Sequence, residues 1–184
     1  MSSRIAIASS LIALAACGRA PSSTLREDAY VWQRQWTPAV VDAVGAARFD
    51  ALRVLALDVS RDGNSEIAFE ASALQGHRVI PVLRIEGSGA IDGATLVDDA
   101  AAELARFRGL QVVALEIDHD CAAGKLASYA ASLRALKASL SVPLQITALP
   151  SWAPSPALDD VMDAVDAVTL QVHAVDRPDA GLFS

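Results

Sequence analysis

The sequence predicts an α/β protein, specifically a (β/α) barrel of the TIM type that is incomplete, with about six of its eight βα units. Short runs rich in Val, Ile and Leu alternate with amphipathic stretches from residue 28 onward, which is typical of parallel strands joined by helices. The expected strands recur about every 25 residues, a spacing that suits a barrel better than an open doubly wound sheet. No GxGxxG or GxxxxGK motif follows any strand, so the usual nucleotide-binding motifs are excluded and no cofactor is expected.

Strands and helices are expected to alternate along the chain. The strands cover 29–36, 52–60, 78–86, 112–120, 144–152 and 167–175. The helices cover 38–48, 95–108, 125–140 and 157–165. Thr37 followed by Pro38 predicts a helix start, because the hydroxyl can cap the first turn and proline suits the first helical position. The segment 61–76 is ambiguous, since 67–74 could form a short helix or a loop.

The helix expected at 125–140 should cover one face of the sheet. Its apolar side chains recur at helical spacing on one side, namely Leu126, Tyr129, Ala130, Leu133, Leu136 and Leu140. Its charged side chains lie off that side, at Lys125, Arg134 and Lys137. The arrangement is that of a helix packed on a sheet, with its polar side toward water.

The N-terminus predicts an export signal. Arg4 carries a single charge before the uncharged run 5–16, which is too short to cross ~30 Å of hydrocarbon and fits the apolar region of a secretory signal. The run ends in Leu14-Ala15-Ala16-Cys17-Gly18, which resembles the lipobox of bacterial lipoproteins. The resemblance implies cleavage after Ala16, a diacylglyceryl group on the Cys17 thiol and an acylated new amine. The alternative is an ordinary signal peptide with an incidental cysteine.

Composition and charge limit the partners of the exported chain. The formal net charge of −7 for the full sequence, which becomes −8 when Arg4 is removed, gives no electrostatic reason to bind nucleic acid, or to bind an anionic bilayer directly. With Cys17 lipidated, Cys121 has no partner for an intramolecular disulfide, and no CxxC metal motif is present. The segment 17–27 is expected to be a lipidated tether that holds the domain at 28–184 close to the membrane. Gly18 follows the cysteine instead of Asp, so in a two-membrane cell we expect the outer membrane, facing the periplasm.

Three carboxylates dominate the fourth expected strand. Because strand side chains alternate, Glu116, Asp118 and Asp120 share the face opposite to Leu115 and Ile117. The leucine and isoleucine should pack against helices, which places the acids inside the barrel, at the strand end where barrel enzymes have their active sites. Acids spaced roughly 6–7 Å apart repel one another, and such crowding can leave one carboxyl protonated to act as a general acid.

The other strands add polar and aromatic groups to the same interior. Those expected to bind a ligand are Trp32, Arg34, Arg84, Glu86, Trp152, Gln171 and His173. Further polar groups on this face are Asp58, Gln145, Thr147 and Thr169. Buried polar groups must pair with each other or with a ligand, so a polar core that satisfies itself, with Arg84 neutralising Asp118, stays open as an alternative. A metal site made of Asp118, Asp120 and His173 is a further alternative, although no metal is expected.

Several segments together resemble a known family. They are 114–120 (ALEIDHD), a helix with Tyr129, 146–152 (ITALPSW) and 165–173 (VDAVTLQVH). Their succession is similar to a family of bacterial lipoproteins classified as a domain of unknown function, and that family looks like a glycoside-hydrolase barrel. More distantly, the fourth strand is similar to the DxDxE strand of family 18 chitinases. On that resemblance Glu116 and Asp118 take its two aspartate positions, and Asp120 takes the position of the catalytic glutamate.

Two functions of different classes follow. The first is a carbohydrate-active enzyme acting on a cell-envelope or extracellular glycan, with Asp120 as the acid and with Asp118 and Glu116 orienting it. The second is a non-catalytic lipoprotein that binds a glycan or an envelope partner in the same cleft. Because the chain stops soon after the sixth expected strand, we expect a truncated barrel with open edges. We also expect the chain as given to be poorly stable or oligomeric, and to have no glycosidase activity.

Overall fold

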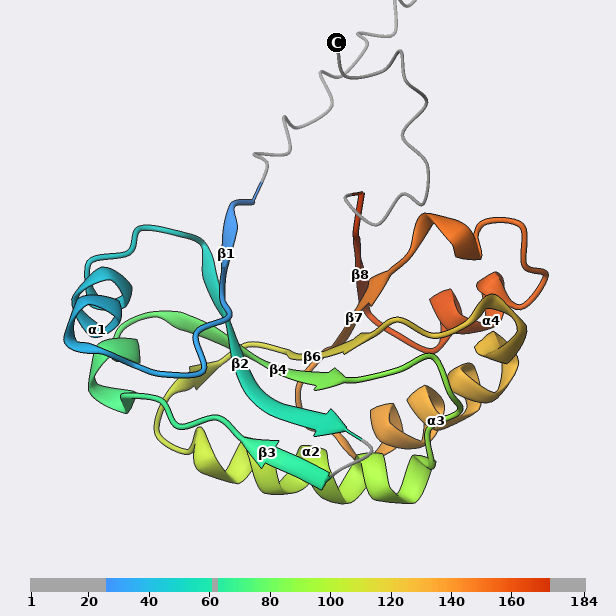
Figure 1. Cartoon of the computed structure of the whole chain (residues 1–184), viewed down its shortest axis with the longest axis horizontal. Helices are drawn as coiled ribbons and strands as arrows, with labels where there is room; N and C mark the ends of the chain where they lie inside the picture. The colour runs from blue at the N-terminus through green and yellow to red at the C-terminus, as the bar shows by residue number, and fades with distance from the viewer. Residues whose placement is uncertain (1–25, 61–62, 173–184) are drawn as a thin grey trace, which may run out of the picture.

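The computed structural model describes residues 26–60 and 63–172. These residues form a strongly curled sheet with helices along its convex side (Figure 1). The predicted signal segment 1–16, the lipidation site Cys17 and the end of the last expected strand, including His173, lie outside the described residues. The described part of the chain is therefore a mixed α/β half-barrel, which is compatible with an incomplete (β/α) barrel.

Six parallel strands form the main path of the sheet, in the order β1-β2-β4-β6-β7-β8. They are β1 (Asp28–Val31), β2 (Ala51–Ser60), β4 (Arg78–Ile85), β6 (Leu115–His119), β7 (Leu144–Ala148) and β8 (Ala167–Leu170). Off this path, β3 (Gly63–Glu66) pairs antiparallel with β2, and β5 (Gln111–Val112) pairs parallel with β4. In the described residues β1 and β8 are the two ends of the path, and they stand on opposite sides of the concave opening (Figure 1).

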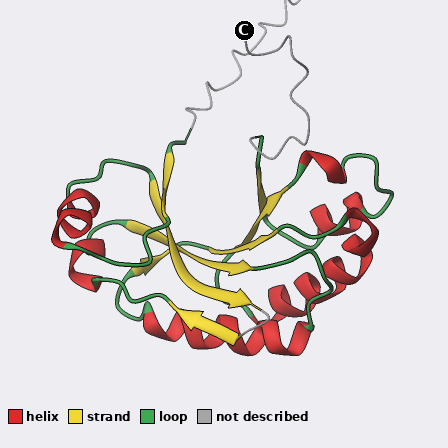
Figure 2. Cartoon of the chain, in the orientation of Figure 1, coloured by secondary structure: helices red, strands yellow, loops and turns green. Residues whose placement is uncertain are grey.

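The helices lie on the outside of the curl (Figure 2). They are α1 (Pro38–Gly45), α2 (Gly93–Arg106), α3 (Leu126–Ser139) and α4 (Leu158–Asp163). The predicted start of the first helix is confirmed, because Thr37 Oγ1 accepts a hydrogen bond from the Val40 N–H at 3.4 Å and Pro38 opens the helix. None of the described helices combines the length and the apolar character needed to cross a membrane.

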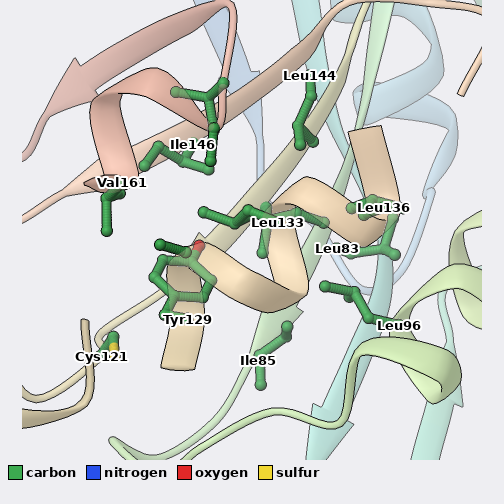
Figure 3. Close-up of a cluster of buried hydrophobic side chains, with 14 of the residues drawn as sticks. Leu83, Ile85, Leu96, Cys121, Tyr129, Leu133, Leu136, Leu144, Ile146 and Val161 are labelled. Carbon is green, nitrogen blue, oxygen red and sulfur yellow. The ribbon is translucent and has the colours of Figure 1, made fainter. Parts of the chain in front are cut away.

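The main hydrophobic core lies between the sheet and the helices α2, α3 and α4. Figure 3 shows Tyr129, Leu133 and Leu136 of α3 in this cluster, together with Leu83 and Ile85 of β4. Tyr129, Leu133 and Leu136 belong to the apolar stripe predicted for this helix, and each has at most 1% of its surface exposed. A second core cluster packs β1 and β2 against α1 and the 3₁₀ turn η1 (Ala71–Leu74).

Several predicted strand boundaries were wrong. The first strand ends at Val31 instead of residue 36. The fourth is divided into β5 and β6, because pairing with β4 shifts by one residue between Val79↔Val112 and Val82↔Glu116. The fifth ends at Ala148, and the 3₁₀ turn η3 (Pro150–Trp152) follows, since proline has no N–H to donate to a neighbouring strand.

The ambiguous segment 61–76 contains a hairpin strand that was not predicted. Residues of β3 pair with the end of β2, from Leu57↔Glu66 to Ser60↔Gly63. All four residues of β3 are exposed, and each is either polar or glycine. The segment therefore has no alternation of apolar side chains from which a strand could be predicted. The short helix considered for 67–74 is present in part, as η1.

Candidate functional site

A cleft of about 470 Å³ opens on the concave side of the sheet. Its lining residues are Tyr30, Trp32, Arg84, Asp118, Asp120, Thr147, Thr169, Leu170, Gln171 and Val172. They come from β1, β4, β6, β7 and β8 or from the residues that follow these strands. The cleft thus lies toward the C-terminal ends of parallel strands, where (β/α) barrels place their binding sites.

The alternation predicted for the acidic strand is confirmed. Leu115 and Ile117 are fully buried in the core with α2 and α3, whereas Asp118 and Asp120 line the cleft on the other side. Glu116 is also on the concave side, but it is completely buried below the cleft. The three acids therefore differ in depth, with Glu116 at the base, Asp118 half-buried in the wall and Asp120 exposed at the rim.

The base of the concave side is a buried ion pair between Glu116 and Arg53. Arg53, on β2, reaches across β4 to the Glu116 carboxylate on β6. Its Nη2 also donates to Asp28 Oδ2 at 2.8 Å, and Tyr30 donates its phenolic hydrogen to Glu116 Oε1 at 2.8 Å. A buried carboxylate is costly unless it is paired and hydrogen-bonded, and both conditions are met here. Glu116 therefore has a structural role, and its carboxylate is not accessible from the cleft.

Arg53 was not predicted as part of the site, because β2 is irregular. The pairing of β2 with β4 shifts between Leu55 and Leu57, so Ala56 is an extra residue on the β2 side. An inserted residue reverses the parity of the alternation, and as a result Arg53 and Asp58 face the same concave side. The only signal in the sequence was a charged residue inside the otherwise apolar run 51–57.

Tyr30 links the two ends of the sheet path. Its ring lies under the Arg53 guanidinium, 5.5 Å from ring centroid to Cζ, and its hydroxyl hydrogen-bonds with the Thr169 side chain of β8. Burial raises the pKa of the Tyr30 phenol, while the positive charge of Arg53 opposes the rise. The tyrosine therefore stays protonated at neutral pH and keeps its hydrogen for Glu116. It shares a face with Trp32 in β1 and the loop that follows, a signal that sequence analysis could have used.

The Asp118 carboxylate is held by two donors from neighbouring strands. Thr147 Oγ1 donates to Asp118 Oδ1 at 2.6 Å, and Gln171 Nε2 donates to the same oxygen at 2.8 Å. The alternative in which Arg84 neutralises Asp118 is not found, because no ion pair joins them although the two residues are register neighbours. Arg84 Nη1 instead donates to Asp58 Oδ1 at 3.1 Å, and Arg34 pairs with the other oxygen of Asp58. The polar interior is thus partly self-satisfied, through Asp58.

The predicted aromatic and acidic binding residues divide into two groups. Trp32 lines the cleft, is 38% exposed, and stacks on Tyr30 with a centroid separation of 5.3 Å and an interplanar angle of 4°. The expected place of Trp152 at the cleft mouth was wrong, because it is buried in the helix layer, where its Nε1 donates to the Cys121 carbonyl at 2.7 Å. Glu86 lies in a separate hollow beside Gly87, so its expected position was wrong as well.

Neither His119 nor the predicted metal set adds to the cleft. His119 is buried on the helix side, with Nδ1 3.2 Å from the Ile85 carbonyl oxygen and Nε2 3.1 Å from that of Gly89. No cluster of three potential metal ligands occurs within residues 26–60 and 63–172. The set of Asp118, Asp120 and His173 includes a residue outside that range, so it stays untested.

Fold and cleft define a class of protein: an α/β half-barrel with helices on the convex side and a polar cleft with an aromatic wall on the concave side. A family model described as a domain of unknown function, DUF3142, matches residues 75–184, and the chain belongs to this family. The match includes Arg84, Asp118 and Gln171, whereas Tyr30 and Trp32 precede it. Neither a search of curated proteins nor a search of solved structures gives a match.

Replacing Arg53 with methionine should lower the free energy of unfolding by about 3–5 kcal/mol, because Glu116 and Asp28 would lose the cation that compensates their burial. Urea denaturation followed by circular dichroism measures the change. Arg134→Met is the matched control, since its ion pair with Asp160 is exposed and should contribute less than about 1 kcal/mol. Equal effects of the two substitutions would contradict a structural role for the buried pair.

Proposed function

We propose that the concave cleft binds a carbohydrate, as part of a lipoprotein acting on cell-envelope or extracellular glycan. The observation that carries the proposal is the position of Trp32, a partly exposed indole that stacks on Tyr30 and lines the same cleft as Asp118. A flat aromatic surface suits the apolar face of a sugar ring, and nearby polar groups suit its hydroxyls. The stack on Tyr30 holds the indole in place before any ligand arrives, which lowers the entropic cost of binding.

The polar wall of the cleft supports this assignment. Asp118 is oriented by Thr147 and Gln171, so its carboxylate presents acceptor positions in a defined direction. Thr169 and Arg84 add a hydroxyl and a guanidinium to the lining. The resemblance of the β6 segment to the DxDxE strand of family 18 chitinases, and of the family to a glycoside-hydrolase barrel of the TIM type, favours the same class of ligand.

Trp32→Ala should weaken binding of a glycan by about tenfold or more, because loss of an aromatic anchor typically costs on the order of 2 kcal/mol. Isothermal titration calorimetry against a panel of hexose and hexosamine oligosaccharides measures the change. Phe49→Ala is the matched control, since Phe49 is another exposed aromatic residue but lies in a groove beside α1 and does not line the cleft. A glycan whose affinity is unchanged in Trp32→Ala does not bind where we propose.

A second candidate function is hydrolysis of the bound glycan. Asp118 and Asp120 line one cleft at the C-terminal end of β6, which favours acid–base chemistry with Asp120 as the acid and Asp118 as its neighbour. Glu116 has no direct part in this chemistry, because Arg53 and Tyr30 occupy its carboxylate.

If the cleft is catalytic, Asp120→Asn and Asp118→Asn should each reduce the rate of reducing-end release by about a hundredfold or more. Asp98→Asn, an exposed residue of α2 on the convex side, removes the same charge and should leave the rate unchanged. Turnover that persists in both cleft variants would exclude these residues as the acid–base pair. Binding without turnover would assign the chain to the non-catalytic class.

We also propose that the chain is exported and attached to a membrane by lipid on Cys17, in the outer membrane facing the periplasm of a two-membrane cell. The lipobox-like segment Leu14-Ala15-Ala16-Cys17-Gly18 supports this proposal. Several acyl chains on one residue give stable anchoring, whereas a single chain gives only marginal binding.

Cys17→Ser should move the protein from the detergent phase to the aqueous phase in a Triton X-114 partition and should abolish incorporation of a labelled fatty acid. Cys121→Ser is the matched control, because Cys121 is buried and burial raises the pKa of its thiol to about 11. The control should stay in the detergent phase. Retention of Cys17→Ser in that phase would contradict lipidation at this residue.

A further inference from the structure

We infer that the carbohydrate taken by this cleft is a cationic amino sugar, one whose amine is free and protonated instead of acetylated. The inference rests on the proposed carbohydrate-binding function and names its ligand class. Its starting point is the distribution of charge around the cleft. The carboxylates of Asp118 and Asp120 both line it, and no ion pair involves either of them in the described part of the chain.

The cations near the cleft are engaged with other carboxylates. Arg84 and Arg34 both bind Asp58, one at each carboxylate oxygen. Arg53 is enclosed at the base by Glu116 and Asp28. The charged side chains that line the cleft, together with the Asp58 and Arg34 pair beside Arg84, are three carboxylates (Asp58, Asp118, Asp120) and two guanidiniums (Arg34, Arg84), which leaves a net charge of −1. The two carboxylates that have no ion-pair partner among the described residues are those contributed by β6 and the residue after it, Asp118 and Asp120, whereas both arginines are paired with Asp58.

The aromatic wall favours the same kind of ligand. Trp32 and Tyr30 stack nearly parallel beside the carboxylates, so the cleft combines π-systems with anions. Tryptophan is the best aromatic partner for a cation, and carboxylates are the best acceptors for an ammonium. Because Trp32, Asp118 and Asp120 line one cleft, we expect a ligand bound there to contact both the indole and the carboxylates.

The orientation of Asp118 gives the ammonium a defined place. Thr147 and Gln171 both donate to Oδ1, and Oδ2 accepts no hydrogen bond from the residues the structure describes. An ammonium carries three donors and no acceptor, so it matches Asp118 Oδ2 and the Asp120 carboxylate. An N-acetyl group has no charge and one N–H, so it offers these carboxylates a single neutral donor where an ammonium offers three charge-assisted ones. The acids therefore select the free amine over the acetylated one.

The overall charge of the chain also favours a cationic ligand. A formal net charge of −7 attracts cationic polymers toward the molecule and repels acidic ones. A polymer of amino sugars carries one positive charge per residue when it is fully deacetylated and its amines are protonated. Its attraction to the cleft should weaken as salt screens the charges, whereas the binding of a neutral glycan should not.

The test is calorimetric titration of the full chain in detergent with a glucosamine oligosaccharide and its N-acetylated counterpart of equal length. A uronic acid oligosaccharide serves as the anionic probe. We expect a preference of about tenfold for the glucosamine oligosaccharide over the acetylated one at low salt, decreasing at high salt. Asp118→Asn should reduce this preference about tenfold, and the exposed Asp120→Asn roughly two- to fivefold. Asp98→Asn, which removes an equal charge from the convex side, should leave it unchanged.

Any other outcome refutes either the cationic ligand or carbohydrate binding itself. Equal affinity for the two hexosamine probes, or preference for the acetylated or the acidic probe, refutes the cationic ligand but leaves carbohydrate binding standing, provided that Trp32→Ala still weakens it. A preference that Asp98→Asn reduces as much as Asp120→Asn reflects the overall charge of the chain and refutes selection by the cleft. Failure to bind any probe or any glycan of the wider panel refutes the carbohydrate proposal itself. Because Asp120 is exposed, its variant tests the inference even if Asp118→Asn folds poorly.

Discussion

The concave side of this protein depends on the buried ion pair between Arg53 and Glu116. Taking a carboxylate with no exposed surface out of water costs several kcal/mol unless a cation and hydrogen-bond donors replace the water. Arg53 supplies the cation and Tyr30 supplies a donor, and each also contacts an end of the sheet path. Arg53 binds Asp28 of β1, and Tyr30 hydrogen-bonds with Thr169 of β8. The network therefore connects β1, β2, β6 and β8 where backbone pairing between β1 and β8 is absent from the described residues.

The cleft above this base follows from the same arrangement. Because Tyr30 is fixed by Glu116, it offers a stable surface for Trp32, and the aromatic wall faces the carboxylates of β6. Polarity rises from base to rim: Glu116 is neutralised, Asp118 is held by two neutral donors, and Asp120 is exposed. A ligand would meet anions at the rim and an aromatic wall beside them, the combination from which the binding proposals start.

The family match and the cleft overlap without coinciding. The matched residues 75–184 contain the polar wall, with Arg84, Asp118 and Gln171, and also the core that Leu115 and Ile117 form with the helices. The aromatic wall and Arg53 precede the match. Glu116 lies inside the matched residues and its partner Arg53 lies before them, so the ion pair connects the two parts of the chain beneath the cleft. A ligand would touch residues from both parts.

The sequence by itself determined the local features that depend on neighbours along the chain. The helix start at Thr37-Pro38, the apolar stripe of α3, and the opposite faces of Leu115 and Asp118 each follow from a fixed period, and the structure has them all. Only the tertiary structure decided what depends on pairing between strands. Because Ala56 is an extra residue in β2, Arg53 faces the concave side together with Asp58. Arg84, considered as a partner for Asp118, pairs with Asp58 instead. After the turn at Pro150, Trp152 lies in the helix layer. Periodicity gives the direction of a side chain only while a strand is regular, and ion-pair partners are chosen among several charges brought close by the fold, which no spacing along the chain encodes.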